Sequence, residues 1–261
     1  MADPVEPKWD AVLFDLDGTL LELSMTQFLE QYLTGMAQEL KDHLDPDRLP
    51  GWVQAAVRAV LLDTRPDISN EEVFWEAFRE LSGADRNVIM AAVDSFHRRH
   101  LPALRHLAEP APGARRAVDA ARRYSRRLVL ATQPLYPAAA IGERVRWAGL
   151  APAEFHLITS MENMWACKPW VQYYQAILDL VGAGDPRRVL MVGNDPILDM
   201  AAGSLGIHTF LLEPPPGKGP AMEVRWLAEA GLEGVTAVPQ PTYLGRLEDV
   251  PDIIKQGPAA A

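Results

Sequence analysis

The amino-acid sequence predicts an α/β fold, in which a doubly wound parallel sheet carries an inserted all-helical segment. An apolar strand near the N-terminus ends in acidic residues, in the stretch VLFDLDGT at 12–19. A long stretch of helical pattern without a strand follows, and strands alternate with helices again from Pro110. This alternation is typical of a parallel sheet, which places its chemistry at the carboxyl ends of its strands.

The composition is that of an ordinary globular protein, with 261 residues, 48% hydrophobic and 23% charged. A net charge of −10 argues against a nucleic-acid partner, which needs a dense basic face. The Arg-rich stretch 115–127 has helical spacing and is interpreted as a solvated helix face. No long apolar run or signal-like segment is present, which predicts a cytoplasmic protein without a membrane partner. Cys167 is the single cysteine and cannot form an internal disulfide.

The first strand delivers Asp15 and Asp17 into a tight turn with Gly18. Residues i and i+2 of a strand point the same way, so both carboxyl groups can face one site. Because buried carboxylates are costly without a cation or hydrogen bonds, the pair favours a metal or a reaction. The alternative is an Asp-Gly turn whose acids only bond the backbone.

Residues 23–107 are predicted to form a helical cap of four amphipathic helices. The first covers about 24–43 and the fourth runs from about 85 towards 104. Two capping boxes are expected at helix starts, Ser24 with Gln27 and Ser69 with Glu72. The remaining α/β core is assigned to 9–22 and 108–255, and 1–8 and 256–261 are expected to be loose tails.

In the second part of the core the pattern alternates between helix and strand. The expected helices are 112–124, 137–149, one opened by Pro169, 196–205 and 221–231, and the expected strands are 127–131, 155–159, 189–192 and 209–212. The stretch 242–255 is interpreted as a short strand or helix.

Polar residues of complementary chemistry follow four apolar segments. They are Asp15 and Asp17, Thr132 and Gln133, Lys168, and Asp195 and Asp199. Carboxylates suit a hard divalent cation, one carboxylate can act as a nucleophile, and a lysine with a hydroxyl can bind an oxyanion. This set is typical of phosphoryl transfer. Taken alone, Lys168 would be a surface lysine and Thr132 a strand-end hydroxyl.

The ordered motifs, Asp-x-Asp-Gly-Thr, strand-Thr, Lys-Pro and Gly-Asn-Asp with a second Asp four residues on, resemble the phosphatase branch of the haloacid dehalogenase (HAD) superfamily. The resemblance covers nearly the whole chain. It implies a Rossmann-like core with a helical cap, in which Asp15 is the nucleophile and forms an aspartyl-phosphate. Asp17 would be the general acid and then the base.

The resemblance also implies the binding residues. Thr132 would hold a phosphoryl oxygen through its hydroxyl, Gln133 through its backbone N–H, and Lys168 would neutralise the transferring group. Mg²⁺ would bind Asp15, the backbone carbonyl of Asp17, and Asp195, with Asp199 bonding a metal-bound water or Lys168.

One departure from the family pattern lies in the last motif. Gly193-Asn194 stands where Gly-Asp is commoner, so the metal register can shift by one residue between Asn194 and Asp195. We choose Asp195 because a carboxylate suits magnesium better than an amide does.

The expected function is a Mg²⁺-dependent phosphatase that acts on a small phosphorylated metabolite. The alternatives are a phosphomutase and a catalytically weak binding or regulatory protein on the same scaffold. A dehalogenase is disfavoured because it has no leaving alkoxide for Asp17 to protonate. Candidate substrate-selecting residues in the cap are Arg58, Arg65, His97 and Arg98. The pair His97 and His100 is interpreted as a partly exposed helix face, and the oligomeric state is left open.

Overall fold

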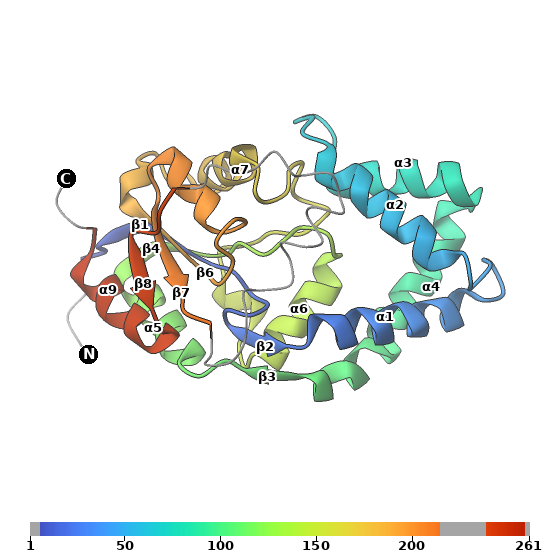
Figure 1. The fold of residues 1–261 in the computed structure, drawn as a ribbon, viewed down its shortest axis with the longest axis horizontal. Helices are drawn as coiled ribbons and strands as arrows, with labels where there is room; N and C mark the ends of the chain where they lie inside the picture. Colours follow the sequence, from blue (N-terminus) through green and yellow to red (C-terminus); the bar gives the residue numbers. More distant parts are fainter. Residues whose placement is uncertain (1–5, 215–238, 259–261) are drawn as a thin grey trace.

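A six-stranded sheet forms the centre of the computed structural model, which describes residues 6–214 and 239–258 (Figure 1). The strand order is β5-β4-β1-β6-β7-β8, and every neighbouring pair is parallel. The strands are β1 Trp9–Phe14, β4 Ser125–Leu130, β5 Leu157–Ile158, β6 Val189–Gly193, β7 His208–Leu212 and β8 Tyr243–Gly245. The predicted α/β fold with a parallel sheet is confirmed.

Helices cover both faces of this sheet. The α-helices of the core are α5 Ala114–Tyr124, α6 Ala138–Trp147, α7 Val171–Val181 and α9 Val250–Gln256. Along β1, Val12 and Phe14 pack in the cluster that includes α5, α6 and α9, whereas Ala11 and Leu13 pack in the cluster that includes α7. All four residues are fully buried, as expected for a central parallel strand.

Four helices lie between β2 (Leu21–Leu23) and β3 (Ala108–Pro110), which pair with each other antiparallel. They are α1 Met25–Leu40, α2 Leu49–Leu62, α3 Asn70–Ser82 and α4 Arg86–Arg99, and a 3-10 helix Leu101–Leu107 leads back to the core. We call these four helices the cap. α1 packs against α4, and α2 packs against α3 (Figure 1). The domain boundaries assigned from the sequence stay a prediction.

The helix starts differ in how they are capped. The capping box at α3 is confirmed, because Glu72 N donates to Ser69 Oγ at 3.2 Å and Ser69 N donates to Glu72 Oε2 at 3.1 Å. At α1 the expected box is wrong, since Ser24 makes no side-chain capping bond. Ser24 instead contributes its carbonyl, which accepts from Phe28 N at 2.8 Å.

Two further expectations from the sequence needed correction. Pro169 does not open a helix, because Trp170 is extended (φ −61°, ψ 132°) and α7 begins only at Val171. The expected helix 196–205 is a turn followed by a 3-10 helix, Met200–Leu205. The stretch 242–255 contains both a strand and a helix, β8 and the start of α9, and the helix expected at 221–231 lies outside the described residues.

None of the helices within the described ranges combines the length and the apolar character needed to cross a bilayer.

Candidate active site

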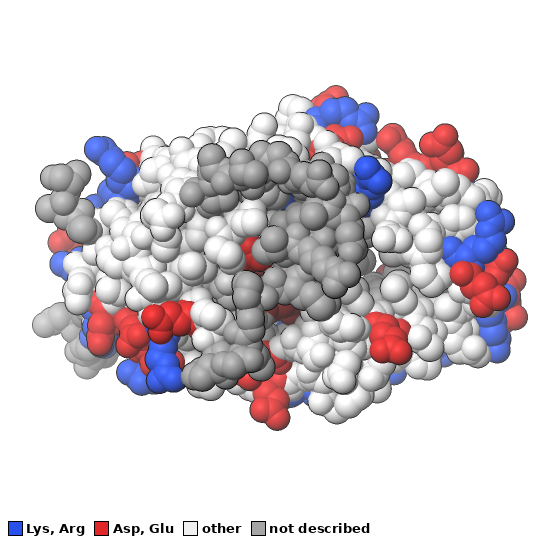
Figure 2. Space-filling model, in the orientation of Figure 1, with Lys and Arg blue, Asp and Glu red and all other residues white. Residues whose placement is uncertain are grey.

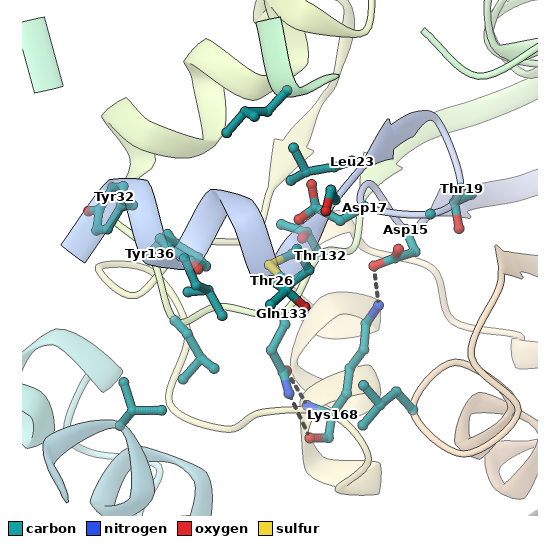
Figure 3. A pocket seen from close by; sticks show the side chains of 18 of the residues that line it. Asp15, Asp17, Thr19, Leu23, Thr26, Tyr32, Thr132, Gln133, Tyr136 and Lys168 are labelled. Carbon is teal, nitrogen blue, oxygen red and sulfur yellow. Dashed lines mark hydrogen bonds and ion pairs between the residues drawn. The ribbon is translucent and has the colours of Figure 1, made fainter. Parts of the chain in front are cut away.

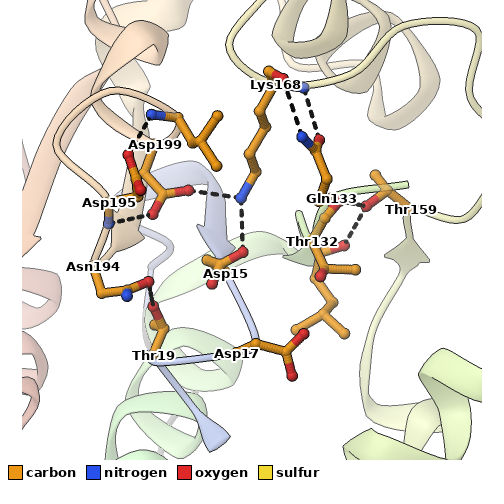
Figure 4. A network of polar contacts seen from close by, with 12 residues as sticks. Asp15, Asp17, Thr19, Thr132, Gln133, Thr159, Lys168, Asn194, Asp195 and Asp199 are labelled. Atoms are coloured by element: carbon orange, nitrogen blue, oxygen red, sulfur yellow. Dashed lines mark hydrogen bonds and ion pairs between the residues drawn. The ribbon is translucent and has the colours of Figure 1, made fainter. Parts of the chain in front are cut away.

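The carboxyl ends of three adjacent strands meet at one large cavity of about 1670 Å³. Because β1 lies between β4 and β6, the segments that follow these strands emerge side by side. Asp15 and Asp17 follow β1, Thr132 and Gln133 follow β4, and Asn194 follows β6. These five residues line the cavity together with Lys168 and Asp199 (Figure 4). The structure therefore brings together the strand-end residues that were predicted from sequence, with Asp195 buried next to them.

Lys168 lies at the centre of the site. Its Nζ donates to Asp15 Oδ1 at 2.7 Å and to Asp199 Oδ1 at 2.6 Å. Lys168 and Asp199 are each 1% exposed, and Asp15 is 8% exposed. Burial works against the charge on Lys168, but the two carboxylates outweigh it and hold its pKa well above the usual value. Burial raises the pKa of Asp199 to about 7, against the opposing effect of Lys168.

Gln133 fixes the backbone of Lys168 through its side chain. Lys168 N donates to Gln133 Oε1 at 2.9 Å, and Gln133 Nε2 donates to Lys168 O at 3.1 Å. Sequence reasoning assigned Gln133 only a backbone role and missed this side-chain clamp. Thr132 is held in a similar way, because its carbonyl accepts from Thr159 Oγ1 at 2.7 Å and from Tyr173 OH at 2.8 Å.

Asp17 forms an ion pair with Arg144 of α6. Arg144 is fully buried, and its guanidinium carbon lies 4.4 Å from the centroid of the Tyr136 ring. Burial raises the pKa of Asp17, and Arg144 opposes that rise. Asp17 Oδ1 has no hydrogen-bond partner within the described part of the chain. Asp17 thus combines one oxygen held by Arg144 with a second that is buried without a hydrogen-bond partner in the described residues.

Arg144 was missed in the sequence analysis because an arginine in a helix usually belongs to the solvated face. The helical spacing did contain a sign that Arg144 is buried. Ile141 and Val145, three residues before and one after Arg144, are fully buried, and Ala148 four residues on is 3% exposed. Arg144 therefore belongs to the apolar stripe of α6, and only the tertiary contact with Asp17 explains a charge there.

The last motif folds into a tight turn beside Lys168. Asp195 Oδ1 accepts from Ile197 N at 2.8 Å and from Leu198 N at 2.7 Å, while Asp195 N donates to Asp199 Oδ2 at 2.9 Å. Asn194 Oδ1 accepts from Thr19 Oγ1 at 3.3 Å. The Asn194 amide also packs on Gly18, whose φ of +88° and lack of Cβ permit this close approach.

A family model described as haloacid dehalogenase-like hydrolase matches residues 9–205, which is most of the chain. The protein belongs to this HAD-like hydrolase family. The match spans β1, the cap helices and the segments that carry Asp15, Lys168 and Asp199. The chain is therefore an enzyme of the hydrolase class.

Solved HAD structures share the fold at low sequence identity. A 2-haloacid dehalogenase from Pseudomonas syringae pv. tomato DC3000 is 17% identical with a TM-score of 0.58, covering 95% of this chain and 99% of that one. A HAD phosphatase from Thermococcus onnurineus is 18% identical with a TM-score of 0.52, covering 96% and 100%. A Bacillus subtilis protein assigned as a HAD hydrolase and bound to magnesium is 17% identical with a TM-score of 0.51, covering 94% and 98%. Comparison with curated protein sequences gives no match.

The oxygen donors of this HAD site fit a hard divalent cation. Within residues 6–214 and 239–258, no group of three or more His, Cys, Asp or Glu side chains is arranged to hold a metal ion by itself. Mg²⁺ needs only one or two carboxylates, since it keeps several waters. Asp15 supplies one carboxylate at the cavity. Asp195 is the candidate for a second, because its Oδ2 is buried without a hydrogen-bond partner among the described residues and burial raises its pKa.

The two alternatives for the metal register differ in position. Asn194 lines the cavity, whereas Asp195 is 1% exposed and is not among the lining residues. Both oxygens of Asp199 already accept bonds, Oδ1 from Lys168 and Oδ2 from Asp195 N. Asp199 is thus placed to orient Lys168, and direct metal ligation by Asp199 or Asp195 stays a prediction.

The cap residues nominated from sequence do not face the cavity. Arg58, Arg65, His97 and Arg98 are not among its lining residues. His97 is 7% exposed, and its Nε2 forms a 2.7 Å hydrogen bond with the Tyr32 hydroxyl. The expectation that His97 and His100 form a partly exposed helix face is therefore wrong for His97, which lies buried against Tyr32 of α1. Burial lowers the pKa of His97 to about 4, so the ring is neutral at pH 7.

Proposed function

We propose that this HAD hydrolase is a Mg²⁺-dependent phosphatase that cleaves a phosphate monoester of a small metabolite through an aspartyl-phosphate on Asp15. The observation that supports it most is the pairing of two acids with different partners on one turn. Asp15 is bonded to Lys168, whereas Asp17, two residues on, is bonded to Arg144 and keeps one buried oxygen without a hydrogen-bond partner among the described residues. A nucleophile and a proton carrier two residues apart match the two needs of ester hydrolysis.

In the first half-reaction an Asp15 oxygen attacks phosphorus, and the bond from phosphorus to the leaving oxygen breaks. Asp17 gives its proton to that oxygen, so the product leaves as a neutral alcohol. Burial raises the pKa of Asp17 against the opposing effect of Arg144, and a raised pKa suits a general acid. Lys168 stabilises negative charge on Asp15 and on the transferring group.

In the second half-reaction a water attacks the phosphorus of the aspartyl-phosphate. Asp17 now takes the proton of that water, and Asp15 leaves as a carboxylate that Lys168 stabilises. The hydroxyl of Thr132 and the backbone N–H of Gln133 are assigned to the phosphoryl oxygens. A bound Mg²⁺ on Asp15, the Asp17 carbonyl and Asp195 or Asn194 would supply positive charge that offsets the repulsion between these carboxylates and a phosphate dianion.

Two alternatives use the same residues. A phosphomutase would return the phosphoryl group from Asp15 to a second hydroxyl of its substrate. A dehalogenase would have no use for Asp17 as an acid, because a halide leaves without a proton. The presence of Asp17 beside Asp15 favours ester hydrolysis over dehalogenation.

The test is hydrolysis of p-nitrophenyl phosphate by the purified chain, with Mg²⁺ and with excess chelator. We expect phosphate release only with the metal, and we expect quenched enzyme to carry one added phosphate on Asp15 by intact-mass and peptide analysis. Undiminished activity in chelator, or phosphate on another residue, would contradict the proposed mechanism. Release of halide from a 2-haloacid without any phosphatase activity would favour the dehalogenase.

A further inference from the structure

The cavity that contains Asp15 extends far into the cap. Its volume of about 1670 Å³ exceeds the range of about 300–1,000 Å³ that is common for small-molecule pockets. All four cap helices contribute apolar side chains to its wall, namely Leu33, Met36, Val53, Val57, Phe74 and Met90. We call the space lined by these six residues the cap chamber. Its wall residues come both from the contacting pair α1 and α4 and from the contacting pair α2 and α3.

Most side chains of the cap chamber are only half-buried. Met36 is buried, whereas the other five retain accessible surface although residues of their kind normally fill a core. Apolar atoms that border an open space lose dispersion contacts on that side, and a contiguous exposed apolar surface typically marks a binding site. The chamber therefore has the character of a site for an apolar group.

Two aromatic residues connect the chamber with the catalytic residues. Figure 3 shows Tyr136 and Tyr32 following each other from Thr132 towards the cap. Their rings meet edge to face with centroids 5.7 Å apart, and both residues line the cavity. The Tyr32 hydroxyl is bonded to His97, so mainly the ring of Tyr32 borders the passage. The route from Asp15 into the chamber is thus lined by aromatic surface.

The charges around the cavity select against a second anionic group. Its lysine and arginine lining residues in the described ranges are Lys168 and Arg246, which come from the core, and His106 of the 3-10 helix Leu101–Leu107 also lines it. Acidic residues of the wall include Glu22, Glu109 and Glu162. Charged side chains lie on the outer surface at the cap end of the molecule (Figure 2). Arg99 of α4 pairs with Glu39 of α1 at 3.0 Å, and the charged residue that α3 adds to the cavity wall is acidic, Glu71. A second phosphate or a carboxylate on the substrate would find no basic partner on the cap helices in this region.

We propose that the substrate is the phosphate monoester of an alcohol with a long, uncharged, mainly aliphatic carbon chain. This inference rests on the phosphatase function proposed above. The phosphate lies at Asp15 and Lys168, and the chain passes Tyr136 and Tyr32 into the cap chamber. Sugar phosphates, bisphosphates and phosphorylated carboxylic acids fit the chamber poorly, because their polar groups would lose water against six apolar side chains that offer no hydrogen bond.

The first experiment is a series of n-alkyl phosphates from butyl to decyl, each below its micelle concentration, with Mg²⁺ and phosphate release as the readout. Each methylene that enters the chamber should raise kcat/KM about two- to fourfold. Glucose 6-phosphate and fructose 1,6-bisphosphate should be poorer substrates than decyl phosphate. Faster turnover of either sugar phosphate than of decyl phosphate would overturn the proposal.

Two matched variants test where the chain binds. Met90→Gln places an amide of similar size in the chamber and should flatten the dependence of kcat/KM on chain length. Leu62→Gln changes an exposed leucine of α2 that is 47% accessible and lies outside the cavity lining, so it should keep the wild-type dependence. Circular dichroism and thermal melts of both variants establish that they are folded. Equal chain-length dependence in folded Met90→Gln and wild type would contradict the assignment of the chamber.

A binding measurement separates this inference from the phosphatase proposal. Calorimetry with decylphosphonate and methylphosphonate, neither of which can be hydrolysed as an ester, needs no turnover. The wild-type protein should bind decylphosphonate at least a hundredfold more tightly than it binds methylphosphonate. If p-nitrophenyl phosphate is hydrolysed but binding and kcat/KM do not depend on chain length, the inference is wrong and the function stands. If no ester is hydrolysed but decylphosphonate binds more tightly, the phosphatase proposal fails and the apolar site stands.

Discussion

The edge of the sheet and the interior of the cap are opposite in character. At the sheet edge, buried charges are paired closely, as in Lys168 with Asp15 and Asp199, and Arg144 with Asp17. In the cap chamber the wall is apolar, and the polar pair of Tyr32 and His97 bonds internally. Both regions border one cavity.

The contrast indicates that the sheet edge and the cap chamber have different functions within one cavity. Buried ion pairs are weak sources of stability, because desolvation offsets much of the attraction between the charges. Their concentration at Asp15 is better explained by the reaction than by folding. An apolar wall cannot transfer protons or bind a phosphate, so the cap chamber can act only on binding and substrate choice. Changes at Asp15, Asp17 and Lys168 should therefore alter kcat, and changes in the chamber should alter preference.

The largest effect is expected from Asp15→Asn. The amide cannot attack phosphorus, so we expect turnover to fall by at least about 10⁴-fold and no covalent phosphate to form. The measurement is steady-state hydrolysis of p-nitrophenyl phosphate with intact-mass analysis of quenched enzyme. Arg58→Ala, at an exposed cap residue away from the cavity, is the control and should retain activity. A phosphorylated Asp15→Asn enzyme would show that the nucleophile is another residue.

Asp17→Asn should have a smaller effect with a different signature. It keeps Asp15 but removes the proton donor and base, which we expect to cost about 10²–10⁴ in rate. With p-nitrophenolate as a good leaving group, the variant should still phosphorylate and then stall. Rapid-quench mass spectrometry should find accumulated phosphoenzyme. Turnover at the wild-type rate would remove Asp17 from the mechanism.

The site residues that could be predicted from sequence are those that belong to short motifs. Asp15, Asp17, Lys168 and Asp199 stand at fixed places after apolar segments, and parallel pairing of β1 with β4 and β6 brings those places together. The capping box at Ser69 was readable for the same reason, because Ser69 and Glu72 interact locally.

The features that were missed depend on contacts between distant segments. Arg144 lies 127 residues from Asp17, and His97 lies 65 residues from Tyr32. A helical pattern predicts which residues share a face, but it does not show which face meets which neighbour. For that reason His97 was interpreted as exposed, and the cap chamber, which needs the relative placement of four helices, was not predictable.

Arg144→Met should chiefly affect stability. Removing the guanidinium leaves the buried Asp17 carboxylate without its partner, and breaking one side of a buried pair costs about 3–5 kcal/mol. Arg146→Met on the same helix is the matched control, because Arg146 has a 61% exposed side chain and pairs with Glu143 at the surface. The free energy of unfolding of the Arg146→Met variant should differ from that of wild type by less than about 1 kcal/mol. Urea unfolding at pH 7 measures both.

A double variant sharpens this test. Asp17→Asn in the Arg144→Met background removes the unpaired charge, so part of the lost unfolding free energy should return. If Arg144→Met and Arg146→Met lose the same stability, the Asp17–Arg144 pair does not hold the sheet edge as described.

The smallest effect concerns the polar pair of the cap. His97 has its pKa lowered from 6.5 to about 4, chiefly by burial, while Asp94 and Glu162 oppose the shift. Below pH 6.5 the unfolded chain binds a proton at His97 that the folded chain does not bind, so stability must fall as the pH drops towards 4. Between pH 7 and 4.5 this amounts to about 2–3 kcal/mol.

His97→Gln keeps a group that can bond Tyr32 but cannot titrate, and should lose less stability over that range. His100→Gln is the control, since the His100 side chain is 57% exposed. Urea unfolding at both pH values gives the difference, and equal pH dependence in His97→Gln and wild type would show that His97 is not buried as a neutral ring.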